Sequence, residues 1–219
     1  MVDLAAATLE SFATRLRRGT RDAHERAEGS EFVARLMAGE LDARAHAHLL
    51  AQLHPVYAAL EAGAERWTDD PNVGPLLHPG LARLPAIESD LTTIVGVDWR
   101  SRLPILPAAR AYAARVTEVA ADWPAGFVAH HYTRYLGDLA GGQAIRVAVR
   151  RHYGLDEDST RFFAFDGLGP VPVFRDAYRS ALEAVSWSSE EQDRAVAESV
   201  VAFGHNRAIF ESFAPAGAR

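Results

Sequence analysis

Residues 135–143 read YLGDLAGGQ, and this stretch lies inside a longer segment with helical periodicity. Three glycines, Gly137, Gly141 and Gly142, surround a single acid, Asp138. Each glycine in a helix interior costs about 1 kcal/mol relative to alanine. Since a domain is stable by only about 5–15 kcal/mol, three such positions indicate a use for a bare backbone. The spacing predicts a helix surface that a neighbouring helix or a flat ligand approaches closely.

The acid in this stretch helps to weigh those two interpretations. Arg134, Asp138 and one of Gly141 and Gly142 share one face of the predicted helix. Tight packing between helices explains the glycines by themselves. A buried carboxylate without a partner is costly, so Asp138 favours a ligand site over plain packing.

Composition limits the classes of protein to which this chain can belong. The 219 residues are 48% hydrophobic, which suits one domain over residues 1–219. With no cysteine, disulfides and thiolate metal sites are excluded. A net charge of −6 argues against nucleic-acid binding. No apolar run reaches the ~18 residues of a membrane span, and the first 18 residues do not follow the order of a secretory signal. We expect a soluble, cytoplasmic protein with no nucleic-acid or membrane partner.

Apolar residues recur three or four positions apart along most of the chain, and no segment alternates like a strand. The pattern predicts an all-α fold of seven to nine helices. Asp42 is a predicted N-cap, Ser188 and Glu191 form a predicted capping box, and Gly154 is a predicted helix stop. Pro55 is expected to kink its helix. The predicted helices cover 9–27, 42–67, 81–95, 108–121, 126–153, 174–185 and a final segment after 188.

A second motif, RRGTRDAHERAE at 17–28, places Arg17, Arg21, His24 and Glu28 on one helix face. A histidine with a carboxylate one turn later suits a haem or metal ligand, because the acid can fix the ring orientation. The arginines suit the carboxylates of a ligand. The alternative is a solvated charged stripe that includes a histidine.

Other polar residues leave further alternatives. Arg175 and Arg179 lie one turn apart and matter only if they face the same ligand as Arg17 and Arg21; otherwise they form an ordinary solvated face. The pairs His24–Glu28 and Asp42–His46 could form half of a di-metal carboxylate site, although Asp42 already has a role as N-cap. The adjacent His130 and His131 point about 100° apart and are interpreted as structural.

Three motifs in order resemble the haem oxygenase family, of the biliverdin-producing, soluble bacterial type. They are RDAHERAE at 21–28, HYTRYLGDLAGGQ at 131–143, and RFFAFDGL with VFRDAYR between 161 and 179. The resemblance extends over a core of about 9–213. It implies a single-domain, multi-helix, all-α fold and an enzyme that uses O2 and electrons to cleave haem b into biliverdin, CO and ferrous iron. Haem would be both substrate and cofactor, and a ferredoxin or flavin reductase would donate the electrons.

The resemblance also implies roles for individual residues. His24 corresponds to the axial ligand of the haem iron and Glu28 to its hydrogen-bond partner. Asp138 corresponds to the residue that organises water on the distal side of the haem, with Arg134 and Tyr57 in the same network. Pro55 departs from the family pattern and could shift Tyr57. The glycines expected over the distal face of the haem are Gly137, Gly141 and Gly142. The residues expected to anchor the haem propionates are Arg17, Arg21, Tyr132, Arg175 and Arg179. The pocket wall and its surroundings are expected to include Phe162, Phe163, Phe203 and Asn206.

Two further interpretations concern partners. A haem carrier or sensor on the same fold would need His24 and the arginines, but not Asp138 and the glycines. Arg15, Arg18 and Arg26 near His24 could form a docking patch for an acidic ferredoxin, or only a solvated face.

Overall fold

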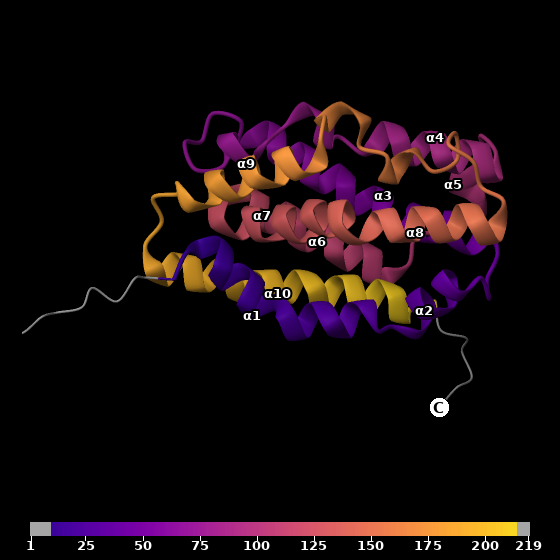
Figure 1. The fold of residues 1–219 in the computed structure, drawn as a ribbon, viewed down its shortest axis with the longest axis horizontal. Helices are drawn as coiled ribbons and strands as arrows, with labels where there is room; N and C mark the ends of the chain where they lie inside the picture. The colour runs from indigo at the N-terminus through magenta and orange to yellow at the C-terminus, as the bar shows by residue number, and fades with distance from the viewer. Residues whose placement is uncertain (1–9, 214–219) are drawn as a thin grey trace, which may run out of the picture.

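The structure is a computed structural model that describes residues 10–213. Over this range the chain forms ten α-helices and no strand (Figure 1), which confirms the all-α class. The helices are α1 Phe12–Glu28, α2 Glu31–Ala38, α3 Ala43–Arg66, α4 Leu84–Val95, α5 Trp99–Arg102, α6 Pro107–Asp122, α7 Pro124–His131, α8 Gly137–Tyr153, α9 Val171–Glu183 and α10 Ser189–Glu211. Leu9, where the first helix was expected to start, lies outside the described residues.

The sequence pattern missed two short helices, α2 and α5. The signals for α2 are local: the Ser30 side chain accepts a hydrogen bond from the N–H of Val33, and Gly39 ends the helix with φ +77°. Only Phe32 and Leu36 of this helix are buried. The helix has only 8 residues, about two turns, which is too short a window to reveal a period of 3.6 residues.

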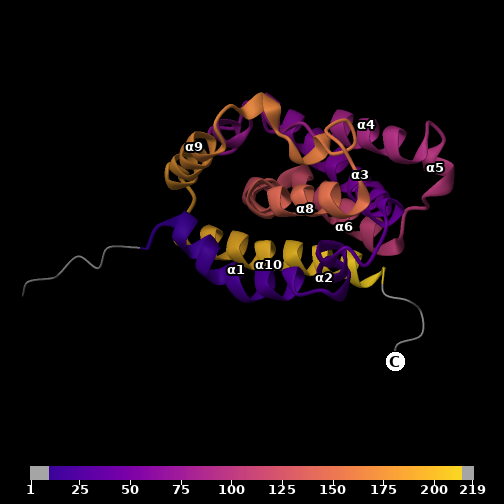
Figure 2. The same ribbon diagram turned by 45° about the vertical axis from the view of Figure 1, so that its right-hand side comes forward.

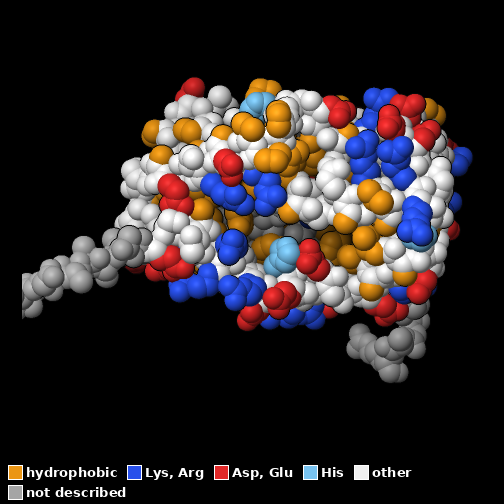
Figure 3. All heavy atoms as spheres, in the orientation of Figure 1, with side chains coloured by type: hydrophobic (Ala, Val, Ile, Leu, Met, Phe, Trp, Pro, Cys, Tyr) orange, Lys and Arg blue, Asp and Glu red, His pale blue; other side chains and the backbone are white. Residues whose placement is uncertain are grey.

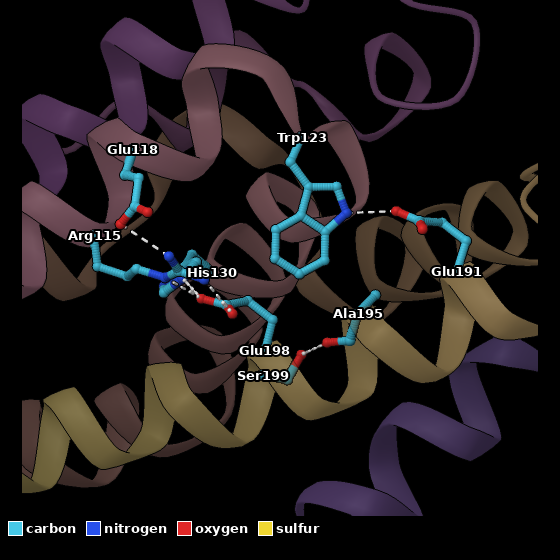
Figure 4. Close-up of polar contacts among 8 residues, drawn as sticks. All are labelled: Arg115, Glu118, Trp123, His130, Glu191, Ala195, Glu198 and Ser199. Atoms are coloured by element: carbon cyan, nitrogen blue, oxygen red, sulfur yellow. Dashed lines mark hydrogen bonds and ion pairs between the residues drawn. The ribbon is translucent and has the colours of Figure 1, made fainter.

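The predicted helix boundaries agree with the structure at several points. The carboxylate of Asp42 accepts a hydrogen bond from the N–H of Ala45 at 2.8 Å, and α3 runs unbroken across Pro55. Gly154 follows α8 with φ +67°. Ser188 caps α10 through the N–H of Glu191, but the Glu191 carboxylate accepts a hydrogen bond from the indole of Trp123 instead of completing the capping box (Figure 4).

The helices are arranged around a central rod formed by α7 and α8. Helices α1 and α10 pack along each other on one side of this rod, and α3, packed against α4 and α6, lies on the other (Figures 1 and 2). One continuous core of buried side chains extends from Phe12 to Ile209. On one side α10 packs directly against α7, and on the other side α3 contacts both α7 and α8.

A buried ionic cluster fixes α10 against α6 and α7. Glu198 is only 5% exposed, and its two carboxylate oxygens each accept a hydrogen bond from Arg115 at 2.8 Å. His130, which is fully buried, contacts the same carboxylate at 2.8 Å (Figure 4). Its structural role agrees with the interpretation made from the sequence.

Candidate active site

The predicted single helix over 126–153 is interrupted by a π-helical turn. Tyr132–Leu136, the segment η3, lies between α7 and α8 and ends directly before Gly137. Such turns are rare and are frequently found at functional sites. Residue preferences do not signal a π-turn, so the sequence did not reveal it. The turn carries Arg134 and shifts the helical phase just where the glycine motif begins.

A cleft lies between α1 on one side and η3 with the start of α8 on the other. It has two lobes, with volumes of about 260 and 290 Å³. Four residues line both lobes: His24, Thr133, Gly137 and Phe203. Figure 3 shows this hollow, with basic side chains gathered around its left end and hydrophobic side chains exposed toward its right.

The first lobe is basic. The predicted arginines come together here, although α1 and α9 are far apart in the sequence: the lobe is lined by Arg17, Arg21, Tyr132, Arg175 and Arg179. The Nε atom of Arg175 is buried without a hydrogen-bond partner among the described residues. Burial raises the pKa of Tyr132, although the nearby arginines act in the opposite direction. This end of the cleft therefore suits the carboxylates of a ligand.

The second lobe is mainly apolar. Besides the polar residues at its inner edge, it is lined by Ala27, Val33, Met37, Ile145 and Phe210. Val33 and Met37 come from α2, so they were missed together with that helix; their spacing of four residues was the available signal. A cleft that is basic at one end and apolar at the other fits a flat amphiphilic molecule.

His24 and Glu28 lie on the α1 wall of the cleft. The Nδ1 atom of His24 is 3.4 Å from a carboxylate oxygen of Glu28, and the ring packs edge-on against Phe203 at 5.5 Å. In a neutral ring this carboxylate favours the proton on Nδ1, so Nε2 is the nitrogen that could act as a ligand. The two residues have the relationship predicted from their spacing.

A polar network lies on the opposite wall. Arg134 donates hydrogen bonds to both carboxylate oxygens of Asp138 at 2.9 Å and to Oδ1 of Asn206 at 2.7 Å. The hydroxyl of Tyr57 donates to the Asp138 carboxylate, so Tyr57 reaches the network despite Pro55. Burial raises the pKa of Asp138, although Arg134 and Tyr57 stabilise its charge. Arg134 thus supplies the partner that a buried carboxylate requires.

The three glycines do not all have the same surroundings. A Cβ atom at Gly137 would meet nothing within 4 Å, and one at Gly141 would meet only Glu28, at 3.7 Å. At Gly142 it would collide with the ring of Phe163, at 2.6 Å. Gly137 and Gly141 therefore leave space in the cleft, whereas Gly142 permits close packing behind the helix. Close packing therefore accounts for Gly142, while the space at Gly137 and Gly141 is compatible with the ligand interpretation.

Some predicted residues lie away from the cleft. Phe162 and Phe163 are buried and line neither lobe; they pack behind α8, where Phe163 lies beside Gly142, so they belong to the surroundings of the pocket and not to its wall. His131 is buried, its Nδ1 lies 2.9 Å from the Tyr178 hydroxyl, and burial lowers its pKa to about 3. Among residues 10–213, no three His, Asp or Glu side chains come together to hold a metal, so the di-metal alternative with His46 lacks a ligand set.

The three arginines considered as a docking patch for a ferredoxin differ in whether their side chains are exposed or bound within the protein. Arg15 is bound to Gln192, to the backbone of Ser189 and to Asp193 on α10. Arg18 is 68% exposed and pairs with Glu10 at 2.8 Å, and Arg26 is exposed. Arg15 is therefore a structural contact rather than part of an open basic patch.

The fold and the cleft define a class of protein: an all-helical chain with a cleft that is basic at one end and apolar at the other. The family model described as Heme oxygenase matches residues 10–212. The chain belongs to the haem oxygenase family.

Individual relatives agree with this assignment. Heme oxygenase 1 of Nostoc sp. is 34% identical over 202 residues, which cover 92% of this chain and 85% of that protein. The heme oxygenase of Takifugu rubripes is 35% identical over 198 residues, covering 90% and 72%. The crystal structure of heme oxygenase-1 from Synechocystis in complex with heme superposes with a TM-score of 0.89 at 33% identity, covering 94% and 93% of the two chains.

Membership of the family identifies the chain as an enzyme that acts on haem, with biliverdin, CO and iron as products. None of the helices found over residues 10–213 is long and apolar enough to cross a membrane.

Proposed function

We propose that haem b binds between α1 and α8, with Nε2 of His24 as the axial ligand of its iron and O2 as co-substrate. The observation that carries this proposal is the polarity of the cleft, with His24 lining both lobes. The propionates would lie against the arginines of the basic lobe, and the apolar edge of the porphyrin in the other lobe. The unpartnered Nε of Arg175 and the open space at Gly137 fit such a ligand.

Haem, when bound, supplies both the iron that activates O2 and the ring carbon that is oxidised. The chain supplies position and protons. Asp138 is held by Arg134 and Tyr57 at the edge of the apolar lobe. A carboxylate held there can orient water and pass a proton from it toward the reacting face of the ligand. The bare backbone at Gly137 and Gly141 leaves room for this water and for O2.

The presence of this network favours catalysis over transport. A haem carrier or sensor would use His24 and the basic lobe, but would have no use for a largely buried Asp138 whose charge needs Arg134 and Tyr57 to stabilise it. We further propose a cytoplasmic location, which suits a chain without cysteine. An external ferredoxin or flavin reductase is the proposed source of electrons.

Haem titration followed by turnover tests the proposal. The purified protein should bind haemin in a complex of roughly one to one with a histidine-type spectrum, which His24→Ala should lose. Under O2 with ferredoxin and its reductase, the haem absorption band should be replaced by that of a verdin. A haem band that persists through turnover with this donor would contradict the proposal.

A further inference from the structure

Asp90 is a buried acid on α4 that belongs to neither wall of the cleft. It is 0% exposed. Its Oδ1 accepts a hydrogen bond from the backbone N–H of Arg161, and its Oδ2 accepts one from that of Phe162, both at 2.9 Å. These two bonds fix the short 3₁₀ turn Arg161–Phe163, labelled η4. A buried carboxylate is costly unless its oxygens are paired in this way, so the arrangement is specific.

The turn that Asp90 fixes lies directly behind the distal network. The ring of Phe162 packs edge-on against the ring of Tyr57, with centroids 5.4 Å apart. The ring of Phe163 occupies the space beside Gly142, and its backbone carbonyl accepts a hydrogen bond from the side chain of Gln143 at 2.6 Å. The turn thus contacts both the residue that bonds to Asp138 and the helix that carries Asp138.

Other polar contacts make the turn a defined element rather than a loose loop. Arg83 is 7% exposed and donates a hydrogen bond to the carbonyl of Phe162 at 3.1 Å. The charges of Arg161 and Arg146 also favour the ionised form of Asp90. Burial raises the pKa of Asp90 to about 6, against the effect of the two backbone N–H groups.

We propose that Asp90 is a positioning residue for catalysis: by fixing η4 it holds the ring of Tyr57 and the glycine-rich start of α8, and through them the carboxylate of Asp138. It touches neither the ligand nor the reacting atoms. Misplacement of a catalytic group by about 1 Å can cost ~100-fold in rate, so losing the support that Asp90 gives to η4 should lower kcat measurably. The effect on turnover rests on the function proposed above, whereas the effect on α8 does not.

Asp90→Asn tests the inference with a side chain of equal size. It replaces one acceptor by an NH2 group that faces a backbone N–H. In the haem-free protein, amide hydrogens of residues 139–145 and 161–163 should exchange roughly tenfold faster. In the haem complex, kcat for verdin formation should fall roughly tenfold. The loss of haem affinity should be smaller, because only the apolar lobe includes residues of the loosened segment, whereas His24 and the arginines lie on other elements. Asp122→Asn, at an exposed position at the end of α6, is the matched control.

Gln143→Leu provides a second variant that removes the link between α8 and η4 at a half-buried position, in case Asp90→Asn does not fold. Like Asp90→Asn, it should speed amide hydrogen exchange over residues 139–145 and lower kcat for verdin formation. Unchanged exchange over 139–145, or losses of kcat and haem affinity in equal proportion, would overturn the inference. If the wild-type protein makes no verdin, the proposed function fails, and the exchange experiment still decides whether Asp90 holds α8.

Discussion

The ring of Phe163 lies 2.6 Å from where a Cβ atom of Gly142 would stand, whereas Gly137, five residues earlier, faces nothing within 4 Å. One glycine motif therefore serves two purposes. Gly142 lets the helix approach the chain behind it, and Gly137 keeps the cleft open in front of it. Two substitutions with the same chemistry should consequently have opposite effects on stability.

Gly137→Ala should raise the free energy of unfolding of the haem-free protein by about 1 kcal/mol, the helix preference of alanine over glycine. Gly142→Ala should lower it by about 1–3 kcal/mol, because the new methyl group collides with Phe163. Urea unfolding of both variants measures these changes. Gly137→Ala should also weaken haem binding, since its methyl group points into the cleft. Equal changes in the free energy of unfolding of both variants would contradict the different roles assigned to Gly137 and Gly142.

Asp138→Asn should separate haem binding from turnover. The variant keeps the shape of the network but removes the charge that orients water, so verdin formation should fall about 100-fold. Haem affinity should change by less than a few-fold, because His24 and the basic lobe are untouched. Spectral titration and verdin yield measure the two quantities. Tyr57→Phe, which removes one hydrogen bond to the same carboxylate, should give a smaller loss. An unchanged verdin yield for Asp138→Asn would exclude Asp138 from the mechanism.

Arg175→Gln should weaken the binding of haem about tenfold, the value of roughly one charge-assisted hydrogen bond. It should leave the binding of haem dimethyl ester unchanged, because the ester has no carboxylates for the arginine to contact. Arg151→Gln, at an exposed position in the last turn of α8, is the control. If both forms of haem lost affinity equally, Arg175 would contribute to the shape of the cleft rather than to recognition of charge.

Glu198→Gln should destabilise the fold in a pH-dependent manner. Burial alone would raise the pKa of Glu198, but the hydrogen bonds from Arg115 and His130 outweigh it and lower that pKa to about 2. The unfolded chain has a glutamate pKa of about 4.3, so the stabilisation is complete above this pH and is lost as the pH falls toward 2. Because breaking a buried ion pair is strongly destabilising, Glu198→Gln should lower the free energy of unfolding by about 3 kcal/mol at neutral pH.

Urea unfolding at pH 7 and at pH 3 measures this dependence. The difference between Glu198→Gln and the wild-type protein should be smaller at pH 3. Glu118→Gln is the matched control, because Glu118 also pairs with Arg115 but is 69% exposed. Its effect should stay below about 1 kcal/mol at either pH, as for surface ion pairs. A difference that did not change with pH would assign the stabilisation by Glu198 to packing rather than to charge.

Much of the helical architecture was predictable from local pattern. The N-cap at Asp42 and the helix end at Gly154 depend on neighbouring residues only, so spacing identified them. The relationship between His24 and Glu28 was also local, because it lies within one turn of α1. Helix α2 was missed, and with it Val33 and Met37 of the apolar lobe, because two turns carry too little periodicity.

By itself, the sequence determined the helix faces: His24 with its arginines on one, and Arg134 with Asp138 on another. Only the tertiary structure decided that these faces oppose each other across one cleft, that Arg175 and Arg179 join Arg17 and Arg21 there, and that Gly142 packs on Phe163. The physical reason is that helix periodicity is set by bonds between near neighbours. Which faces meet, and where a π-turn shifts the phase, depends on packing between segments far apart in the chain.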